Sequence, residues 1–249
     1  MAEKIRDLMK GLYYCRKCQN TCLEGRICEG AFPEPLIGNW QASFAILGKN
    51  PGPIDLRFKD LNEYVDHYSN HKKCGLDLKE CWQIGYFLAY AKLMNPESTI
   101  DDFNRDAVIL NTIKCSTGST EDTNRIPETD LEKAKDNCRD HLIRQIQTIK
   151  PKVILSHGKF ACWATIDMLR NERKNVVSAL SSCNIDTLAE KNMNEISEEY
   201  VMVENEDGRK VLFFFNKHLS FCPIAMRSLE KNIEKKKRMI EDLLQAPKS

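Results

Sequence analysis

Three short apolar runs, each leading into a turn, dominate the hydrophobic pattern of the chain. They are Ser43–Leu47, Ala107–Lys114 and Val153–Ser156, the last followed by His157-Gly158. Apolar runs of this length, bounded by glycine and polar residues, are typical of buried strands. Segments with helix-spaced apolar residues separate and follow the runs. The pattern therefore predicts strand-then-helix units that build a parallel sheet with right-handed crossovers.

Apolar residues at helical spacing predict the remaining elements. The expected helices are Lys4–Tyr14, Glu80–Met94, Thr129–Ile149, a segment after Gly158, and Pro223–Leu244. Tyr200–Val203 and Val211–Phe215 flank a polar stretch and predict a hairpin or a broken strand pair. Pro53–Lys79 is polar without clear periodicity, which favours a long functional loop with some helix.

Length and composition favour a single globular domain over residues 1–249, because 42% apolar and 29% charged residues are ordinary values. Within it we expect a cysteine-rich segment at 1–42, an insertion at 171–199 and a C-terminal helix at 223–245. The formal net charge of +1 excludes a globally basic nucleic-acid binder, so any phosphate-binding surface must be local. The basic block Lys235–Arg238 fits either a solvated helix face or a DNA contact.

No apolar run approaches the roughly 20 residues of a membrane span. The N-terminus, MAEKIRDLMKG, is charged and lacks the apolar core of a signal peptide. We therefore expect an intracellular protein, cytoplasmic or nucleoid, that has no membrane partner.

Eleven cysteines are many for an intracellular chain, and they indicate metal or cluster ligation for some of them. Cys15 and Cys18 form a Cys-x2-Cys pair, which lets two thiolates reach one metal from a single turn. Cys22 and Cys28 follow closely and could complete a local site, although distant thiols could do so as well. Unligated thiols are the remaining interpretation.

The first strand runs into Gly48-Lys49-Asn50-Pro51-Gly52, which is the first candidate active site. Open α/β sheets place their ligands at the carboxyl ends of strands. The two glycines permit close backbone approach, and Pro51 restricts Asn50 to extended geometry, so that the amide is held in a fixed direction. An ordinary strand-to-loop exit would also explain these residues taken alone.

An ordered set of motifs resembles the uracil-DNA glycosylase superfamily, especially its iron–sulfur branch (families four and five). The set comprises Cys15 and Cys18, GKNPG at 48–52, LNTIKC ending at Cys115, Asn124-Arg125-Ile126-Pro127-Glu128, Cys138, ILSHG, and His218-Leu219-Ser220 followed by Arg227. The GKNPG turn departs from the GEAPG-like turn of that branch. It looks like the GINPG or GMNPG turns of the mismatch-specific and single-strand-selective branches, in which the asparagine is catalytic. HLS replaces HPS, and the 171–199 segment is longer than the family usually allows.

The resemblance implies a three-layer α/β/α fold with a short central parallel sheet and a bound cofactor. By resemblance, the ligands of a [4Fe–4S] cluster are Cys15, Cys18, Cys115 and Cys138, which leaves Cys22 and Cys28 outside it. Tetrahedral zinc would use the same four ligands.

The resemblance also implies a substrate, which is DNA containing uracil or a related deaminated base, handled by a monomer. Asn50 would orient the attacking water, His218 would donate to uracil O2, and Asn111 would bind the uracil edge. The other expected substrate-binding residues are Gly48, Lys49, Pro51, Gly52, Ser220 and Arg227. A flipped base should also stack on an aromatic ring, for which Phe58, Tyr64 and Tyr68 are the candidates.

Two alternatives to an active glycosylase remain open from the residues. One is a superfamily member that binds DNA or a modified base without cleaving it, which Lys49 and the altered loops would favour. The other is a nucleic-acid-binding protein stabilised by a local zinc site within Cys15–Cys28.

Overall fold

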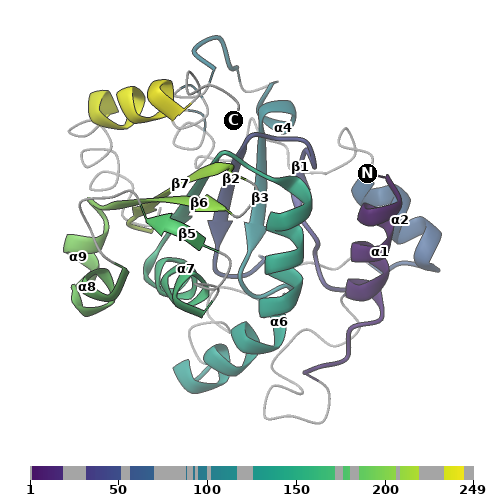
Figure 1. The fold of residues 1–249 in the computed structure, drawn as a ribbon. Coiled ribbons are helices and arrows are strands. Elements are labelled where there is room, and N and C mark those ends of the chain that lie inside the picture. Colours follow the sequence, from purple (N-terminus) through teal and green to yellow (C-terminus); the bar gives the residue numbers. More distant parts are fainter. Residues whose placement is uncertain are drawn as a thin grey trace.

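The computed structural model describes residues 2–18, 32–51, 57–69, 88, 92, 95–99, 102–116, 126–171, 176–179, 185–205, 208–218 and 233–243 (Figure 1). The expected helix Glu80–Met94 and the N-terminal part of the expected C-terminal helix lie largely outside these ranges.

The described strands form one seven-stranded sheet at the centre of the molecule (Figure 1). They are β1 (Ile37–Gly38), β2 (Phe44–Gly48), β3 (Ala107–Asn111), β4 (Val153–His157), β5 (Val176–Ala179), β6 (Tyr200–Asn205) and β7 (Lys210–Asn216), in the order β1-β3-β2-β4-β7-β6-β5. The four central strands β3, β2, β4 and β7 run parallel, and the pairings at both edges are antiparallel. The expected parallel sheet and the β6–β7 hairpin are confirmed.

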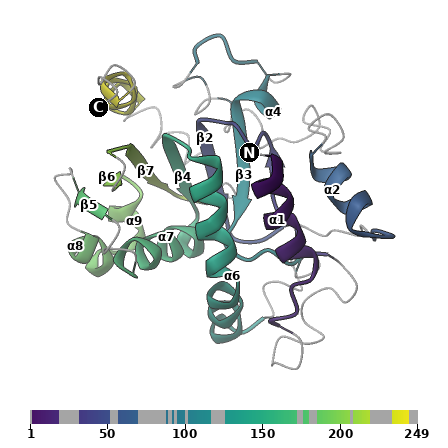
Figure 2. The same cartoon turned by 45° about the vertical axis from the view of Figure 1, so that its right-hand side comes forward.

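Helices lie on both sides of this sheet, which confirms the expected α/β/α layers (Figures 1 and 2). They are α1 (Ala2–Tyr13), α2 (Leu61–Ser69), α4 (Phe103–Asp106), α6 (Glu128–Ile149), α7 (Lys159–Asn171), α8 (Ile185–Glu190), α9 (Met193–Ile196) and a C-terminal helix at 233–243. None of the helices in the described ranges is both long enough and apolar enough to cross a membrane.

The register of the parallel strands explains the main core. Ala45 of β2 pairs with Val108 of β3 and with Ile154 of β4, and Ile154 pairs with Phe213 of β7. These four residues lie in one row on one face of the sheet, and all belong to the same core cluster as Leu142 of α6 and Ile166 of α7. Parallel strands that are buried on both faces have nearly continuous apolar sequences, and the sequence of this chain shows that pattern.

The opposite face of the sheet carries the C-terminal helix, shown in yellow in Figure 1. Phe214 points away from the face that Phe213 occupies, and the ammonium of Lys236 lies 5.4 Å from its ring centroid. Lys235 lies over the ring of Tyr200 at 5.3 Å. Lys236 is buried, so this member of the basic block packs the helix onto β7 and does not form a solvated face.

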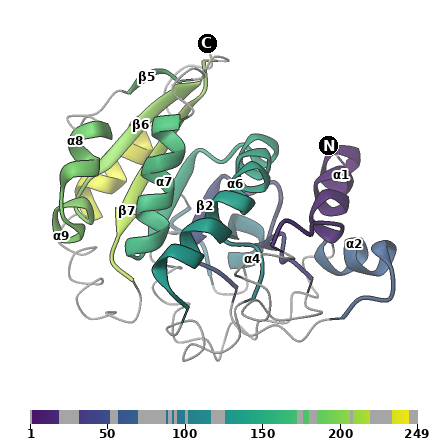
Figure 3. The same cartoon turned by 90° about the horizontal axis from the view of Figure 1, so that it is seen from below.

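The expected insertion at 171–199 contains regular structure in its described parts. β5 extends the sheet beside β6, and α8 packs against α7 (Figure 3). Helix α9 begins with a capping box, in which the side chain of Asn192 accepts from the backbone of Glu195 and the Glu195 carboxylate accepts from the backbone of Asn192.

The chain order of the central strands places a topological switch point at β2. From β2 the chain passes to β3 on one side, and the next strand, β4, lies on the other side of β2. Ligands of open α/β sheets bind outside the carboxyl ends of the strands at such a point.

Burial lowers the pKa of Lys236 to about 8, and this predicts a pH-dependent stability. The unfolded chain keeps this proton up to about pH 10.5, so the free energy of unfolding should rise with pH between about 8 and 10.5. Lys236→Met removes the titration. Its free energy of unfolding, measured in urea and relative to wild type, should therefore fall by about 2–3 kcal/mol from pH 7 to pH 10. Lys235→Met, on the exposed side of the helix, is the control, and an equal change in both variants would contradict the assignment.

Candidate active site

The last residues of the four parallel strands form a row at one edge of the sheet. Gly48 of β2 pairs with Asn111 of β3, and His157 of β4 pairs with Asn216 of β7. Leu47 pairs with Ser156, so Gly48 also lies beside His157. The row Asn111–Gly48–His157–Asn216 therefore brings three polar side chains and one glycine to the switch point of the sheet.

Gly48 keeps the space between its two polar neighbours open. A Cβ atom at this position would lie 2.9 Å from Asn111 Oδ1 and 3.7 Å from His157 Nε2. The first distance is shorter than a side chain tolerates, so any larger residue would displace the Asn111 amide. The glycine is required here because of this close approach.

The turn after β2 is fastened to the segment after β3. Gly48 O accepts a hydrogen bond from Thr112 N–H at 2.9 Å, and Lys49 O accepts from Ile113 N–H at 2.9 Å and from Thr112 Oγ1 at 2.7 Å. Asn50 Nδ2 donates to the carbonyl of Pro51 at 2.7 Å. The backbone that carries Asn50 is thereby fixed relative to Asn111.

His218 reaches the same edge from the end of β7. Gly158 has φ +85° and donates its N–H to Asn216 O at 2.8 Å. A Cβ on Gly158 would lie 2.9 Å from His218 Cδ2, so the histidine ring occupies the space that a side chain would fill. The rings of His157 and His218 are 5.4 Å apart between centroids.

Both imidazoles are kept neutral by their surroundings. Burial, and then the neighbouring His218, lower the pKa of His157 to about 3. The pKa of His218 is lowered by desolvation first and by the Lys49 ammonium second. A neutral imidazole donates one hydrogen bond without carrying a charge, which suits it to stabilise a developing anion.

Lys49 adds a cation to the rim of this edge. Its ammonium lies 5.6 Å from the ring centroid of Phe160, at the start of α7. Burial lowers its pKa, and the carboxylate of Glu128 partly opposes that change. The turn at 48–52 therefore carries an amine, at Lys49, and an amide, at Asn50, but no carboxylate.

Glu34 and Lys114 support Asn111 from the outer side of the row. Asn111 Nδ2 donates to Glu34 Oε2 at 3.3 Å, and the Lys114 ammonium donates to the backbone carbonyl of Asn111. Burial raises the pKa of Glu34 to about 7 against the attraction of Lys114. Burial lowers the pKa of Lys114 to about 7, opposed by Cys138 and then Glu34. These two buried charged residues lie at one end of the row.

Sequence reasoning missed Glu34, Lys114 and His157 as site residues. His157 carried a usable signal, because it follows the third apolar run just as Asn111 ends the second. Glu34 carried none, since it stands between two prolines in a segment without periodicity and reaches Asn111 across 77 positions of sequence.

Four cysteines from distant parts of the chain approach one another beside β3. Cys15 and Cys18 follow α1, Cys115 follows β3, and Cys138 lies buried in α6. Burial raises the pKa of the Cys115 thiol, and the other three thiols raise it further, which places all four within electrostatic reach. Cys22 and Cys28 lie outside the described residues.

Two of these sulfurs accept hydrogen bonds of the kind that tune cluster ligands. Lys114 N–H donates to Cys138 Sγ at 3.4 Å, and Asn137 Nδ2 donates to Cys18 Sγ at 3.4 Å. Within the ranges that the structure describes, no three His, Cys, Asp or Glu side chains are arranged to hold a single metal ion. A four-iron cluster binds each thiolate at a different iron, so its ligands do not need to surround one ion.

Two of the three candidate stacking aromatics are core residues. Tyr64 and Tyr68 are at most 2% exposed, and the Tyr64 hydroxyl donates to Pro33 O at 2.7 Å. Their burial removes both from the surface that a base could reach in this conformation. Phe58 is partly buried and packs edge-on against Tyr64.

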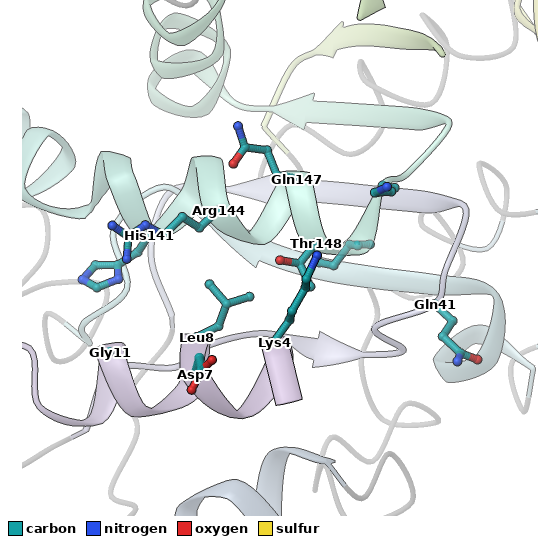
Figure 4. Close-up of a pocket in the computed structure, with 11 residues that line it drawn as sticks. Lys4, Asp7, Leu8, Gly11, Gln41, His141, Arg144, Gln147 and Thr148 are labelled. Atoms are coloured by element: carbon teal, nitrogen blue, oxygen red, sulfur yellow. The ribbon is translucent and has the colours of Figure 1, made fainter. Parts of the chain in front are cut away.

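A separate groove of about 770 Å³ lies between α1 and α6 (Figure 4). Lys4 extends from α1 towards Thr148 of α6 across it. Its lining includes Gln41 and Lys150, which precede β2 and β4, so the groove lies towards the amino ends of the strands. None of the row residues lines it.

Not all of the expected site residues can be placed. Gly48 and Asn111 are in contact, Lys49, Asn50 and Pro51 follow on the same fastened turn, and His218 packs on Gly158 beside His157. Gly52, Ser220 and Arg227 lie outside the described residues.

Sequence comparison finds a relative at low identity. The chain is 27% identical over 160 residues to a protein named type-4 uracil-DNA glycosylase from Archaeoglobus fulgidus. The match covers 64% of this chain and 62% of the relative, which is less than two thirds of its length. No family model matches the chain. The similarity supports a distant relationship between the two proteins.

Gly158→Ala should destabilise the protein by about 2 kcal/mol or more, because it combines positive φ with a steric conflict against His218. Gly11→Ala is the matched control, since Gly11 is an exposed residue of α1 whose added Cβ would meet nothing closer than 4.0 Å. That control should gain about 0.5–1 kcal/mol. Urea unfolding measures both, and a neutral Gly158→Ala would contradict the packing described here.

Lys49→Met should raise the pKa of His218, because it removes the cation that disfavours protonation of the ring. An NMR titration of the His218 Cε1–H resonance measures this pKa in both proteins. Lys152→Met, at the amino end of β4, should leave it unchanged. An unchanged or lowered His218 pKa in Lys49→Met would show that the two side chains do not interact.

Proposed function

We propose that the protein is a monofunctional DNA glycosylase that removes uracil, or a related deaminated base, from DNA. The observation that carries the proposal is the row at the strand ends, where Gly48 leaves the Asn111 amide open beside two neutral imidazoles. The similarity to a protein named type-4 uracil-DNA glycosylase supports the same reaction. The substrate nucleotide is flipped out of the helix to reach this row, at a cost of a few kcal/mol.

Cleavage of an N-glycosidic bond builds negative charge on the departing base and positive charge on the sugar. His218 donates a hydrogen bond to uracil O2 as the negative charge develops. A neutral donor is suitable here because it keeps its proton in the ground state and strengthens the bond only as the base becomes anionic. The lowered pKa of His218 supports this role.

Asn50 orients the attacking water at the sugar, and Asn111 binds the edge of the base. The bond from Asn50 Nδ2 to Pro51 O fixes the direction of the amide. An amide cannot take a proton from water, so the assistance is weaker than a carboxylate would give. The backbone from Gly48 through Pro51 to Gly52 lines the pocket. Lys49, Ser220 and Arg227 contact the DNA in this proposal.

The same proposal assigns a [4Fe–4S] cluster to Cys15, Cys18, Cys115 and Cys138. The mutual approach of four thiols from three segments, and the N–H donors to two of them, support a cysteine-ligated centre. Within the described residues no three such side chains are arranged around one ion, which favours a cluster over a single zinc ion. When bound, the cluster would tie the N-terminal segment to α6 and to the end of β3. Hydrolysis requires no electron transfer, so this role is structural.

A catalytically weak or inactive DNA-binding member is the second candidate. The observation that favours it is the turn at 48–52, where Lys49 and Asn50 leave no carboxylate to act as a base. The assay below separates the two candidates directly.

The purified protein should cleave oligonucleotides that carry uracil, tested single-stranded and opposite guanine or adenine, with alkali used to break the abasic product. His218→Ala and Asn50→Ala should each lower the single-turnover rate by about 100-fold or more. His141→Ala and Asn62→Ala, which lie outside the site, are the matched controls. Rates that fall equally in site and control variants would refute the assigned roles. Tight DNA binding without any strand scission by wild type would favour the inactive candidate.

Cys115→Ser and Cys138→Ser should each lose bound iron and sulfide, measured by chemical analysis and by visible absorption of protein purified without oxygen. Cys162→Ser is the matched control, because Cys162 is a buried thiol of α7 that donates to backbone carbonyls. Stoichiometric zinc in place of iron would select the alternative metal. Full iron retention in Cys138→Ser would contradict the ligand set.

A further inference from the structure

The carboxylate of Glu34 determines which way the amide of Asn111 faces. Glu34 Oε2 accepts from Asn111 Nδ2 at 3.3 Å, and both side chains are buried. In its ionised form the Glu34 carboxylate only accepts hydrogen bonds, and it then selects the amide orientation that turns the NH2 group towards it. Asn111 Oδ1 then faces Gly48, where it lies 2.9 Å from the position of an added Cβ.

The backbone that carries Glu34 is fixed on both sides. Its own N–H donates to Lys114 O at 2.8 Å, immediately beyond the end of β3. The preceding carbonyl accepts from the Tyr64 hydroxyl at 2.7 Å, and the following carbonyl accepts from Gln145 Nε2 at 2.6 Å. Prolines on both sides of Glu34 restrict the segment further. The carboxylate therefore holds a set position relative to Asn111.

The two orientations of an asparagine amide suit different bases. Uracil presents a donor at N3 and an acceptor at O4, whereas cytosine presents an acceptor at N3 and a donor at N4. With Oδ1 towards the pocket, Asn111 accepts from N3–H of uracil, and the second hydrogen of Nδ2 can serve O4. The reversed amide would match cytosine instead. The choice between the bases therefore depends on what fixes the amide.

We propose that Glu34 is a positioning residue that locks the Asn111 amide in its uracil-reading orientation and so makes the pocket reject cytosine. This inference rests on the proposed function and deepens it, because it assigns the specificity of that site to a residue that does not touch the base. The Lys114 ammonium supports the lock by donating to the Asn111 backbone carbonyl from the same side.

Binding to oligonucleotides that contain 2′-fluoro-2′-deoxyuridine or 2′-fluoro-2′-deoxycytidine tests the inference. The fluorine slows glycosidic cleavage, so the ratio of the two dissociation constants measures base preference without turnover. Glu34→Met has a similar length but no acceptor at its end, and it should lower the preference for uracil about tenfold. Glu34→Gln keeps an acceptor oxygen and should stay within about threefold of wild type.

A double-mutant cycle separates positioning from a general structural effect. Asn111→Ala should itself remove most of the preference, and Glu34→Met should then cause no further change in the ratio. Thermal unfolding checks that each variant is folded. If Glu34→Met fails to fold, Glu34→Asp takes its place, because the shorter carboxylate cannot reach Nδ2 and should lower the preference in the same way.

The outcomes distinguish the inference from the function on which it rests. An unchanged base preference in folded Glu34→Met or Glu34→Asp, together with uracil cleavage by wild type, overturns the positioning role and leaves the proposed function standing. A wild-type protein that neither cleaves uracil nor prefers the uracil analogue overturns both. A lowered preference that persists in the Asn111→Ala background also contradicts the inference, since Glu34 would then act through another group.

Discussion

Parallel pairing of β3, β2, β4 and β7 is the constraint on which the rest of the structure depends. Parallel strands in one sheet end at the same edge, so residues that are far apart in sequence become neighbours there. Asn111, Gly48, His157 and Asn216 meet for this reason, at the point where the order of the strands in the sheet changes direction. The apolar rows beneath them fix the register, because a slip of one residue would turn every core side chain to the other face.

The segment after β3 connects the row of strand-end residues to the four cysteines. Thr112 and Ile113 fasten the turn that carries Asn50, Lys114 holds the Glu34 segment, and Cys115 approaches the other three cysteines. Four consecutive residues thus contact the turn that carries Asn50, the segment that carries Glu34 and the proposed cluster site. A metal centre there would contribute to the active site by ordering this segment, with no part in the reaction.

Much of this arrangement could be predicted from the sequence, because periodicity and turn residues are local signals. The apolar runs located β2, β3 and β4, and the motif set selected Asn50, Asn111 and His218 as candidate site residues. Long-range contacts carry no such signal. Glu34 enters the site only because an irregular segment docks against Lys114 and Gln145.

Which individual side chains are buried could also not be predicted from the sequence. Tyr64 and Tyr68 suit base stacking by residue type, yet the fold places them in the core. Lys236 belongs to a basic block that suits a solvated face or DNA, yet it packs on Phe214. Residue type restricts the possible roles of a side chain, and only the packing of neighbouring elements selects one.

The most direct test of the account is a crystal structure of the protein with an oligonucleotide that carries 2′-fluoro-2′-deoxyuridine. The account predicts that the flipped base lies over Gly48, with N3–H donating to Asn111 Oδ1 and with the His218 ring near O2. A base bound elsewhere, such as in the groove between α1 and α6, or DNA bound with the base still stacked in the helix, would contradict it.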